Sequence, residues 1–222
     1  MSETMSPEKR TTVLVSGVAF VIIAILLTNL IPPVEGLGSK VRLPMFHGGS
    51  TWVNMAAFTF MGLFALGYLL LGKRDLYRWG AGFRYVAAPL WLSNTILGVV
   101  AAIGTWDFTG SKQSPFVVIQ ADPRLMTQFI LLTSLAALLL IDRIVESDHL
   151  RAFGDVVFAV LMWVLLYVRV FANAEARALH PDNPVLNSAF EIQAPFFGIV
   201  GCLLVAVCLF AWLIRDGITR RD

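Results

Sequence analysis

Long apolar runs separated by short polar connections dominate the sequence. Six runs come close to the about 20 apolar residues that a transmembrane helix needs, and none alternates in the manner of a membrane β-strand. The runs cover approximately residues 13–31, 51–71, 83–103, 125–141, 153–171 and 192–214. The pattern predicts an all-α polytopic membrane protein, in which residues 1–222 form a single integral membrane domain built as a six-transmembrane-helix bundle.

The composition excludes the soluble alternatives. Hydrophobic residues make up 57% of the chain and charged residues only 14%, whereas a soluble domain carries about 25% charged residues. The net charge of +2 is too small for the basic surface of a nucleic-acid binder. The lipid bilayer is therefore the expected surrounding of most of this chain, and we expect no nucleic-acid partner.

The lysine and arginine residues between the runs predict the orientation in the membrane. One side holds both termini with the second and fourth connections, and it carries eleven of these residues: Lys9, Arg10, Lys73, Arg74, Arg78, Arg84, Arg143, Arg151, Arg215, Arg220 and Arg221. The other side carries six: Lys40, Arg42, Lys112, Arg124, Arg169 and Arg177. Because positive residues gather on the cytoplasmic side, we expect both termini inside. The first, third and fifth connections then face the periplasm or its equivalent.

The three histidines divide between the two sides. His149 lies in a short cytoplasmic turn, where we expect a solvated surface position. His47 and His180 precede the second and sixth runs in two separate outer connections. Imidazole is a common axial ligand of haem iron, so two imidazoles on one face could hold an iron porphyrin between them. In the alternative, each is an interfacial histidine that bonds to water or lipid headgroups.

The third connection lies between the two outer histidines and supplies further candidates. Trp106 and Phe108 could stack on a porphyrin, and Arg124 beside Asp122 could pair with a propionate. In the alternative, the aromatic residues belong to the membrane-interface belt and the Asp–Arg pair caps the fourth helix. Arg169, at the outer end of the fifth run, could neutralise a propionate or reach a lipid phosphate.

Three amides lie within the second, third and fourth runs, where an unpaired polar group is costly. We expect Asn54, Asn94 and Gln128 to form hydrogen bonds between helices.

The order of these segments resembles the haem-handling proteins of cytochrome c biogenesis, of the CcmC/CcsA type. The resemblance covers about residues 40 to 185 and is carried by four segments: Arg42 to His47 followed by Trp52; Gly104-Thr105-Trp106; Asp122 to Leu125 with Thr127; and Tyr167 through Ala178-Leu179-His180-Pro181. The first and last resemble the two histidine segments of the family. The middle two resemble the ends of its tryptophan-rich WWD segment, although Ala121 precedes Asp122 here and only one tryptophan is kept.

The resemblance implies a non-covalent haem b at the periplasmic face of a bacterial inner membrane. His47 and His180 would be the axial ligands, and the WWD segment would lie against the porphyrin. Proteins of this type pass haem to a periplasmic haem chaperone and work with an ABC-type release complex.

Two hypotheses of function follow. In the first, the protein collects haem at the outer face and presents it to a partner. In the second, it is a haem-bearing or scaffold membrane subunit of a larger respiratory or photosynthetic electron-transfer complex, for which bis-histidine ligation is suited. Neither requires bond-making chemistry, and the sequence contains no nucleophile paired with a base, so we expect no enzyme activity.

Overall fold

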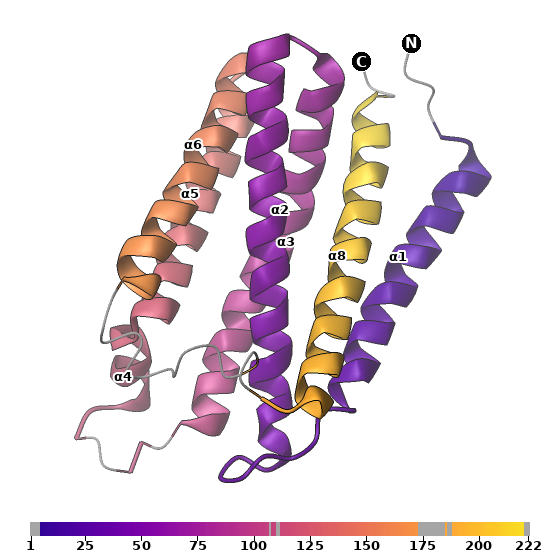
Figure 1. Cartoon of the computed structure of the whole chain (residues 1–222). Helices are drawn as coiled ribbons and strands as arrows, with labels where there is room; N and C mark the ends of the chain where they lie inside the picture. The colour runs from indigo at the N-terminus through magenta and orange to yellow at the C-terminus, as the bar shows by residue number, and fades with distance from the viewer. Residues whose placement is uncertain (1–4, 107, 110–111, 173–184, 186–187, 220–222) are drawn as a thin grey trace.

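The chain folds into a bundle of long helices (Figure 1). The computed structural model describes residues 5–106, 108–109, 112–172, 185 and 188–219. Within these ranges every regular element is helical, and six helices are long and apolar enough to cross a membrane. The predicted all-α class and the six predicted helices are confirmed.

The helix boundaries differ from the predicted ones. The six long helices are α1 (Pro7–Thr28), α2 (Arg42–Leu71), α3 (Arg74–Thr105), α5 (Pro123–Ile144), α6 (Asp148–Leu166) and α8 (Phe190–Thr219). Each begins before the apolar run that predicted it, because its first turn contains polar residues; in α1, α5 and α6 a side-chain cap also supports the first turn. The described residues also form three short elements: the 3-10 turn η1 (Ser39–Val41), helix α4 (Pro115–Ala121) and the π-helical turn η2 (Tyr167–Phe171) that extends α6. Helix α4 lies where the sequence predicts only a connection.

The helices run alternately up and down, so that both chain ends lie at one end of the bundle (Figure 1). We call this the terminal end; it also holds the α2–α3 and α5–α6 turns. The opposite end, here the loop end, holds the α1–α2 connection and helix α4. Helices α2 and α3 pack together in the centre, α1 packs against α8, and α6 packs against α2 and α5. Gly72 ends α2 with a left-handed φ of 65°, which glycine adopts without steric cost.

Small residues bring the helices close together. A Cβ atom on Gly62 of α2 would lie 2.5 Å from the Cβ atom of Ala159 in α6. On Gly82 of α3 it would lie 2.6 Å from the carbonyl oxygen of Ala211 in α8. Small side chains at such crossings are typical of helix packing in membranes, where backbones approach closely and gain van der Waals contact.

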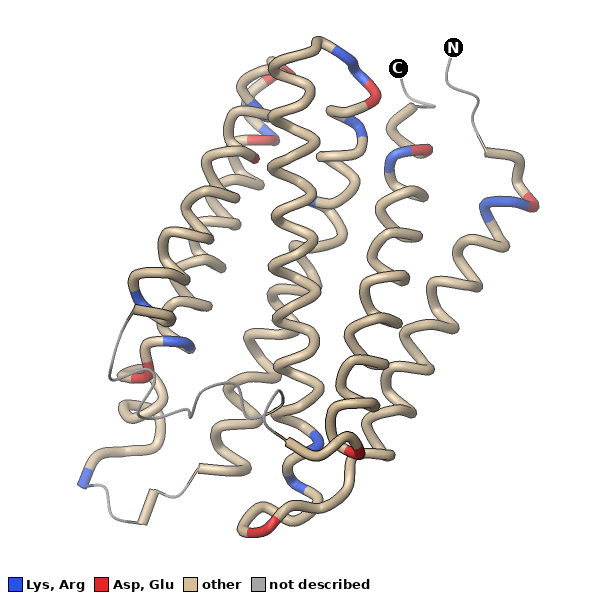
Figure 2. Tube along the Cα trace, in the orientation of Figure 1, with Lys and Arg blue, Asp and Glu red and all other residues tan. Residues whose placement is uncertain are grey.

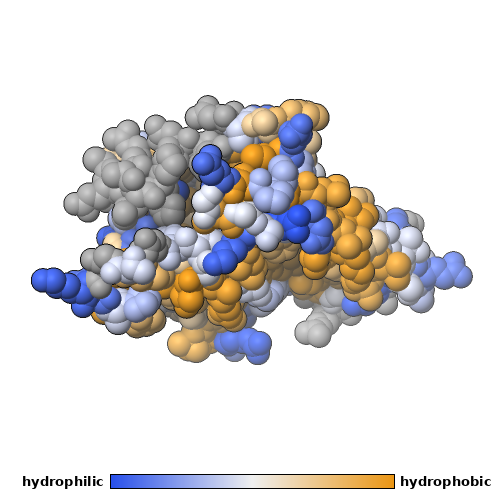
Figure 3. All heavy atoms as spheres, turned by 90° about the horizontal axis from the view of Figure 1, so that it is seen from below, coloured by the Kyte–Doolittle hydropathy of each residue, from blue (hydrophilic) through white to orange (hydrophobic). Residues whose placement is uncertain are grey.

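The outer surface between the two ends is apolar. Leu26, Leu63, Ile96 and Val160 are all more than half exposed, and charged residues gather toward the two ends of the bundle (Figure 2). Seen from the loop end, hydrophilic residues lie over the helix ends and hydrophobic residues form much of the flank (Figure 3). A lipid-facing bundle requires this distribution, because hydrocarbon solvates apolar side chains and excludes charges.

Helix α3 continues through a proline. Pro89 lies inside the helix, and it has no backbone N–H to donate to the carbonyl four residues earlier, that of Tyr85. The helix runs on to Thr105 at the loop end.

Candidate functional site

His47 lies inside helix α2, which corrects the prediction that it belongs to a connection. The helix begins at Arg42, so the imidazole leaves its second turn. Gly49 lets α8 approach this turn closely, because a Cβ atom there would lie 3.3 Å from Ile199, whereas one on Gly48 would make an ordinary contact with Phe196 at 3.7 Å. Close packing of α8 therefore accounts for Gly49.

Both nitrogen atoms of the His47 ring have a partner on a neighbouring helix. The Nδ1 atom lies 3.0 Å from the backbone oxygen of Asn94 in α3, and the Nε2 atom lies 3.3 Å from the side-chain nitrogen of Gln128 in α5. A carbonyl oxygen only accepts, so Nδ1 must donate its proton. In the neutral ring Nε2 then carries the lone pair and accepts from the Gln128 amide.

The amides around His47 test the expectation of hydrogen bonds between helices. Asn94 donates from Nδ2 to the hydroxyl of Thr51 in α2 over 2.8 Å, and Gln128 bonds to His47, so two predictions are confirmed. Asn54 instead donates to the backbone oxygen of Ser50 within its own helix, 3.0 Å away. The prediction for Asn54 is wrong because a carbonyl one turn earlier lies within reach of its side chain.

The two predicted aromatic residues form one cluster next to His47. The rings of Trp106 and Phe108 lie 6.3 Å apart between centroids, and both pack against a buried group that contains Ile119 of α4 and Leu125 of α5. A Cβ atom on Gly98 of α3 would lie 2.8 Å from the His47 ring and 3.1 Å from Leu125. The structure therefore brings His47, Trp106 and Phe108 to the same region of the loop end.

Asp122 is the N-cap of helix α5. Its carboxylate accepts from the backbone N–H groups of Arg124 and Leu125, both at 2.9 Å, and the residue is buried. The cap that the sequence offered as the alternative to a haem contact is confirmed for Asp122. The Arg124 side chain is half-buried at the start of the same helix.

The two remaining candidate haem-binding residues are Arg169 and His180. Arg169 lies half-buried in the π-helical turn after α6, and its Nε atom has no hydrogen-bond partner among the described residues. His180 lies outside the described residues.

The hydrogen bonding of His47 fits a haem ligand, but the Gln128 amide has to move before iron can bind. An N–H group fixed on a backbone carbonyl is the usual support of a ligating imidazole, since it orients the ring and leaves the other nitrogen to bind the metal. Here the Gln128 amide covers that nitrogen, so an iron atom could bind only after the amide moves aside.

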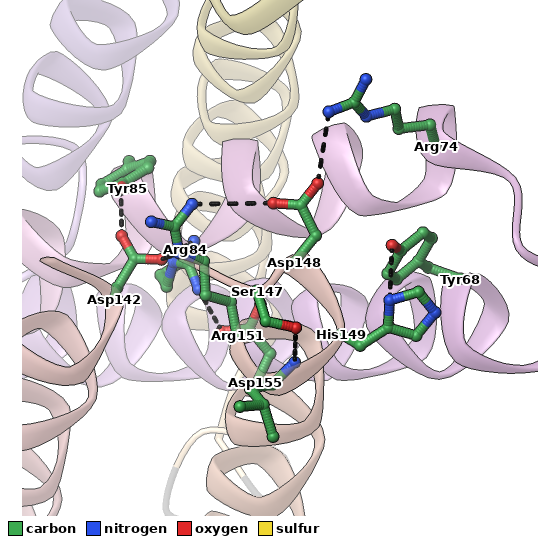
Figure 4. A network of polar contacts seen from close by, with 11 residues as sticks. Tyr68, Arg74, Arg84, Tyr85, Asp142, Ser147, Asp148, His149, Arg151 and Asp155 are labelled. Atoms are coloured by element: carbon green, nitrogen blue, oxygen red, sulfur yellow. Dashed lines mark hydrogen bonds and ion pairs between the residues drawn. The ribbon is translucent and has the colours of Figure 1, made fainter. Parts of the chain in front are cut away.

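A second polar site, which the sequence analysis did not identify, lies at the terminal end (Figure 4). Arg84 of α3 is almost fully buried between two carboxylates. Its guanidinium lies 2.8 Å from Asp142 of α5 and 3.0 Å from Asp155 of α6. Tyr85 also donates a hydrogen bond to Asp142. One arginine thus joins three helices.

The network continues outward to the solvent-exposed helix ends (Figure 4). Arg151 lies 3.5 Å from Asp142 and 3.7 Å from Asp148, and Arg74 lies 3.6 Å from Asp148. His149 is exposed, as predicted, and bonds to the hydroxyl of Tyr68 over 3.2 Å. The ion pairs become longer and more exposed toward the surface.

The sequence did contain a signal for this network. Arg84 and Asp155 each fall at or inside an apolar run, and an ionisable residue in such a run is a candidate for function by default. Counting Arg84 only as a marker of the cytoplasmic side hid that signal.

No protein-family model matches the chain, and a comparison with curated proteins finds no match. The family resemblance therefore rests on the motifs between about residues 40 and 185.

Proposed function

We propose that this membrane protein binds haem b at its loop end and presents it to a partner. His47 would be one axial ligand through Nε2, and His180 would be the other. By the distribution of lysine and arginine, the terminal end lies in the cytoplasm of a bacterium and the loop end faces the periplasm. The partners proposed from the resemblance are a periplasmic haem chaperone and an ABC-type release complex.

The observation that carries this proposal is the hydrogen bond from His47 Nδ1 to the Asn94 carbonyl. It assigns the proton to Nδ1 and orients Nε2, the nitrogen that haem iron takes from histidine. Trp106 and Phe108 lie nearby and provide apolar ring faces. When bound, haem supplies one-electron redox chemistry; the protein holds and orients it, with Arg124 and Arg169 as the proposed partners of the propionates.

A haem titration of the purified protein tests the proposal. Wild-type protein in dodecyl maltoside should bind added haemin and give a b-type reduced-minus-oxidised spectrum. His47→Ala and His180→Ala should each weaken binding by at least about tenfold, as expected for loss of a bond worth more than about 1.4 kcal/mol. His149→Ala is the matched control, because it removes an imidazole at the other end of the bundle. Equal binding by the His47 and His149 variants would contradict the proposal.

The second candidate function is the haem-bearing or scaffold subunit of an electron-transfer complex. One observation favours it: the His47 ring is half-buried, with Gly98 of α3 close beside it and the Gln128 amide against Nε2. A haem that is handed to a partner needs an open ligand, whereas a resident redox haem is best enclosed.

Transfer and co-purification separate the two functions. Haem on a handling protein should pass to excess apomyoglobin within minutes, and a chaperone or ATP-binding subunit should co-purify in mild detergent. A resident haem should stay bound, and cytochromes, iron–sulfur proteins or molybdenum-enzyme subunits should co-purify.

A further inference from the structure

The terminal end contains a cavity of about 700 Å³ that the proposed function does not use. Residues of α1, α3, α5, α6 and α8 line it. The buried Arg84 network forms part of this lining, and we call the space the arginine cavity. Five arginines line it: Arg10, Arg74, Arg84, Arg143 and Arg151.

The arginine cavity has more positive than negative charge. Its lining contains two carboxylates, Asp142 and Asp148, and Asp155 adds a third behind Arg84. Among the described residues, the five arginines therefore outnumber the neighbouring carboxylates by two. A surplus of two cations around one cavity attracts an anion.

Two of the arginines are not committed to a carboxylate. Among the described residues, neither Arg10 nor Arg143 forms an ion pair. The Arg10 guanidinium lies against the last turn of α8, since a Cβ atom on Gly217 would be 3.9 Å from its Nη2 atom. Both side chains are exposed, so they can turn toward a ligand.

Arg84 adds a buried donor to the same cavity. It is 1% exposed, and its Nε–H group has no hydrogen-bond partner among the described residues. Because a buried N–H group without a partner is costly, a ligand oxygen that reached it would remove this cost. The wall formed by α8 is apolar where Leu213, Ile214 and Ile218 line the cavity.

We propose that the arginine cavity binds a phosphate-bearing ligand, held by the exposed Arg10 and Arg143 and by the more buried Arg84 and Arg151. Guanidinium groups match phosphate oxygens with paired hydrogen bonds. A phosphate monoester carries about −1.5 to −2 charges at pH 7, which is close to the surplus of two. The ligand is either the headgroup of an anionic phospholipid, whose glycerol and chains would lie along α8, or a free phosphate compound.

Thermal unfolding of the full chain in dodecyl maltoside tests this proposal. One arm adds dioleoyl phosphatidic acid, a phospholipid whose headgroup is a phosphate monoester, and the other adds inorganic phosphate against sodium chloride of equal ionic strength. Stabilisation by the lipid alone identifies a headgroup site, and stabilisation by inorganic phosphate identifies a site for a free phosphate. If neither raises the melting temperature of the wild type, the proposal is wrong.

Paired variants distinguish binding in the arginine cavity from general attraction to surface charge. Arg10→Gln with Arg143→Gln should weaken binding of the effective probe about tenfold, as expected for loss of hydrogen bonds between charged groups. Lys9→Gln with Lys73→Gln removes the same charge from exposed residues at the same end that do not line the cavity, and should leave binding unchanged. Equal losses in both pairs would show surface attraction only and overturn the site. Arg10→Lys with Arg143→Lys, which keeps the charge, should bind with intermediate affinity.

Discussion

The two ends of the bundle hold their polar groups in different ways. At the loop end, one imidazole is placed by two hydrogen bonds, to a backbone carbonyl of α3 and an amide of α5. At the terminal end, a buried arginine is placed by two full charges, Asp142 and Asp155. A hydrogen bond of His47 can break at a small cost in free energy, because both of its bonds are between neutral groups. An ion pair of Arg84 cannot break at small cost, because a charge would remain buried without its counter-charge.

This difference suits the two ends to different roles. A neutral, separable arrangement suits a site that must accept a ligand, as proposed for His47. A charged, enclosed arrangement suits a fixed support, with Arg84 tying α3 to α5 and α6. The outer arginines around the cavity are exposed and can respond to a ligand, while Arg84 stays in place.

The largest expected effect is the loss of one carboxylate beside Arg84. Asp155→Ala should lower the free energy of unfolding by about 3–5 kcal/mol, because it leaves a buried charge partly unpaired. Thermal unfolding in detergent measures this loss. Asp75→Ala, which breaks the more exposed pair with Arg215, should cost at most about 1 kcal/mol.

A triple variant shows whether charge or packing causes that loss. Replacing Arg84 together with both of its carboxylate partners, as Arg84→Met, Asp142→Leu and Asp155→Leu, should recover much of the stability because apolar groups fill the same volume and no buried charge loses its partner. If Asp155→Ala and Asp75→Ala cost the same, the contrast between the buried network and the surface pairs disappears.

A smaller effect is expected from the helix caps at the two ends. Asp122→Ala at the loop end removes a buried cap that accepts two N–H groups at 2.9 Å, and should cost about 1–2 kcal/mol. Ser147→Ala at the terminal end removes an exposed cap with one contact at 3.5 Å, and should cost about 0.5 kcal/mol. Urea unfolding of both variants measures the two losses in the free energy of unfolding. A larger loss for Ser147→Ala would reverse the expected order.

An effect on stability within the range of the two caps is expected at His47. Gln128→Ala removes one neutral hydrogen bond and should cost about 1 kcal/mol. The same change uncovers Nε2 and should raise haem affinity by about fivefold, the equivalent of that lost bond. Haemin titration of the variant measures this gain. Unchanged or weaker binding would show that the amide does not compete with haem for the nitrogen.

The sequence predicted the helices better than the contacts between them. A run of apolar residues determines that a helix crosses the membrane, so all six were found. Their first turns were missed because polar residues there do not prolong an apolar run. The network at Arg84 could not be predicted as a network, because it joins residues 71 positions apart in the chain through the arrangement of three helices. The motif around His47 was found. Asn94 and Gln128 were predicted to form hydrogen bonds between helices, but not to be the partners of His47.

Pro89 lies between the two ends on a single helix, with Arg84 on one side of it and Asn94 on the other. Because proline removes a backbone hydrogen bond at this point, the helix bends there more easily than elsewhere. Arg84 and Asn94 are ten positions apart, about 15 Å along the axis, and they belong to separate stiff segments. The network at Arg84 fixes the terminal-end segment of α3 against α5 and α6, so bending at Pro89 would change the distance between the Asn94 carbonyl and the imidazole while the contacts of Arg84 stayed in place.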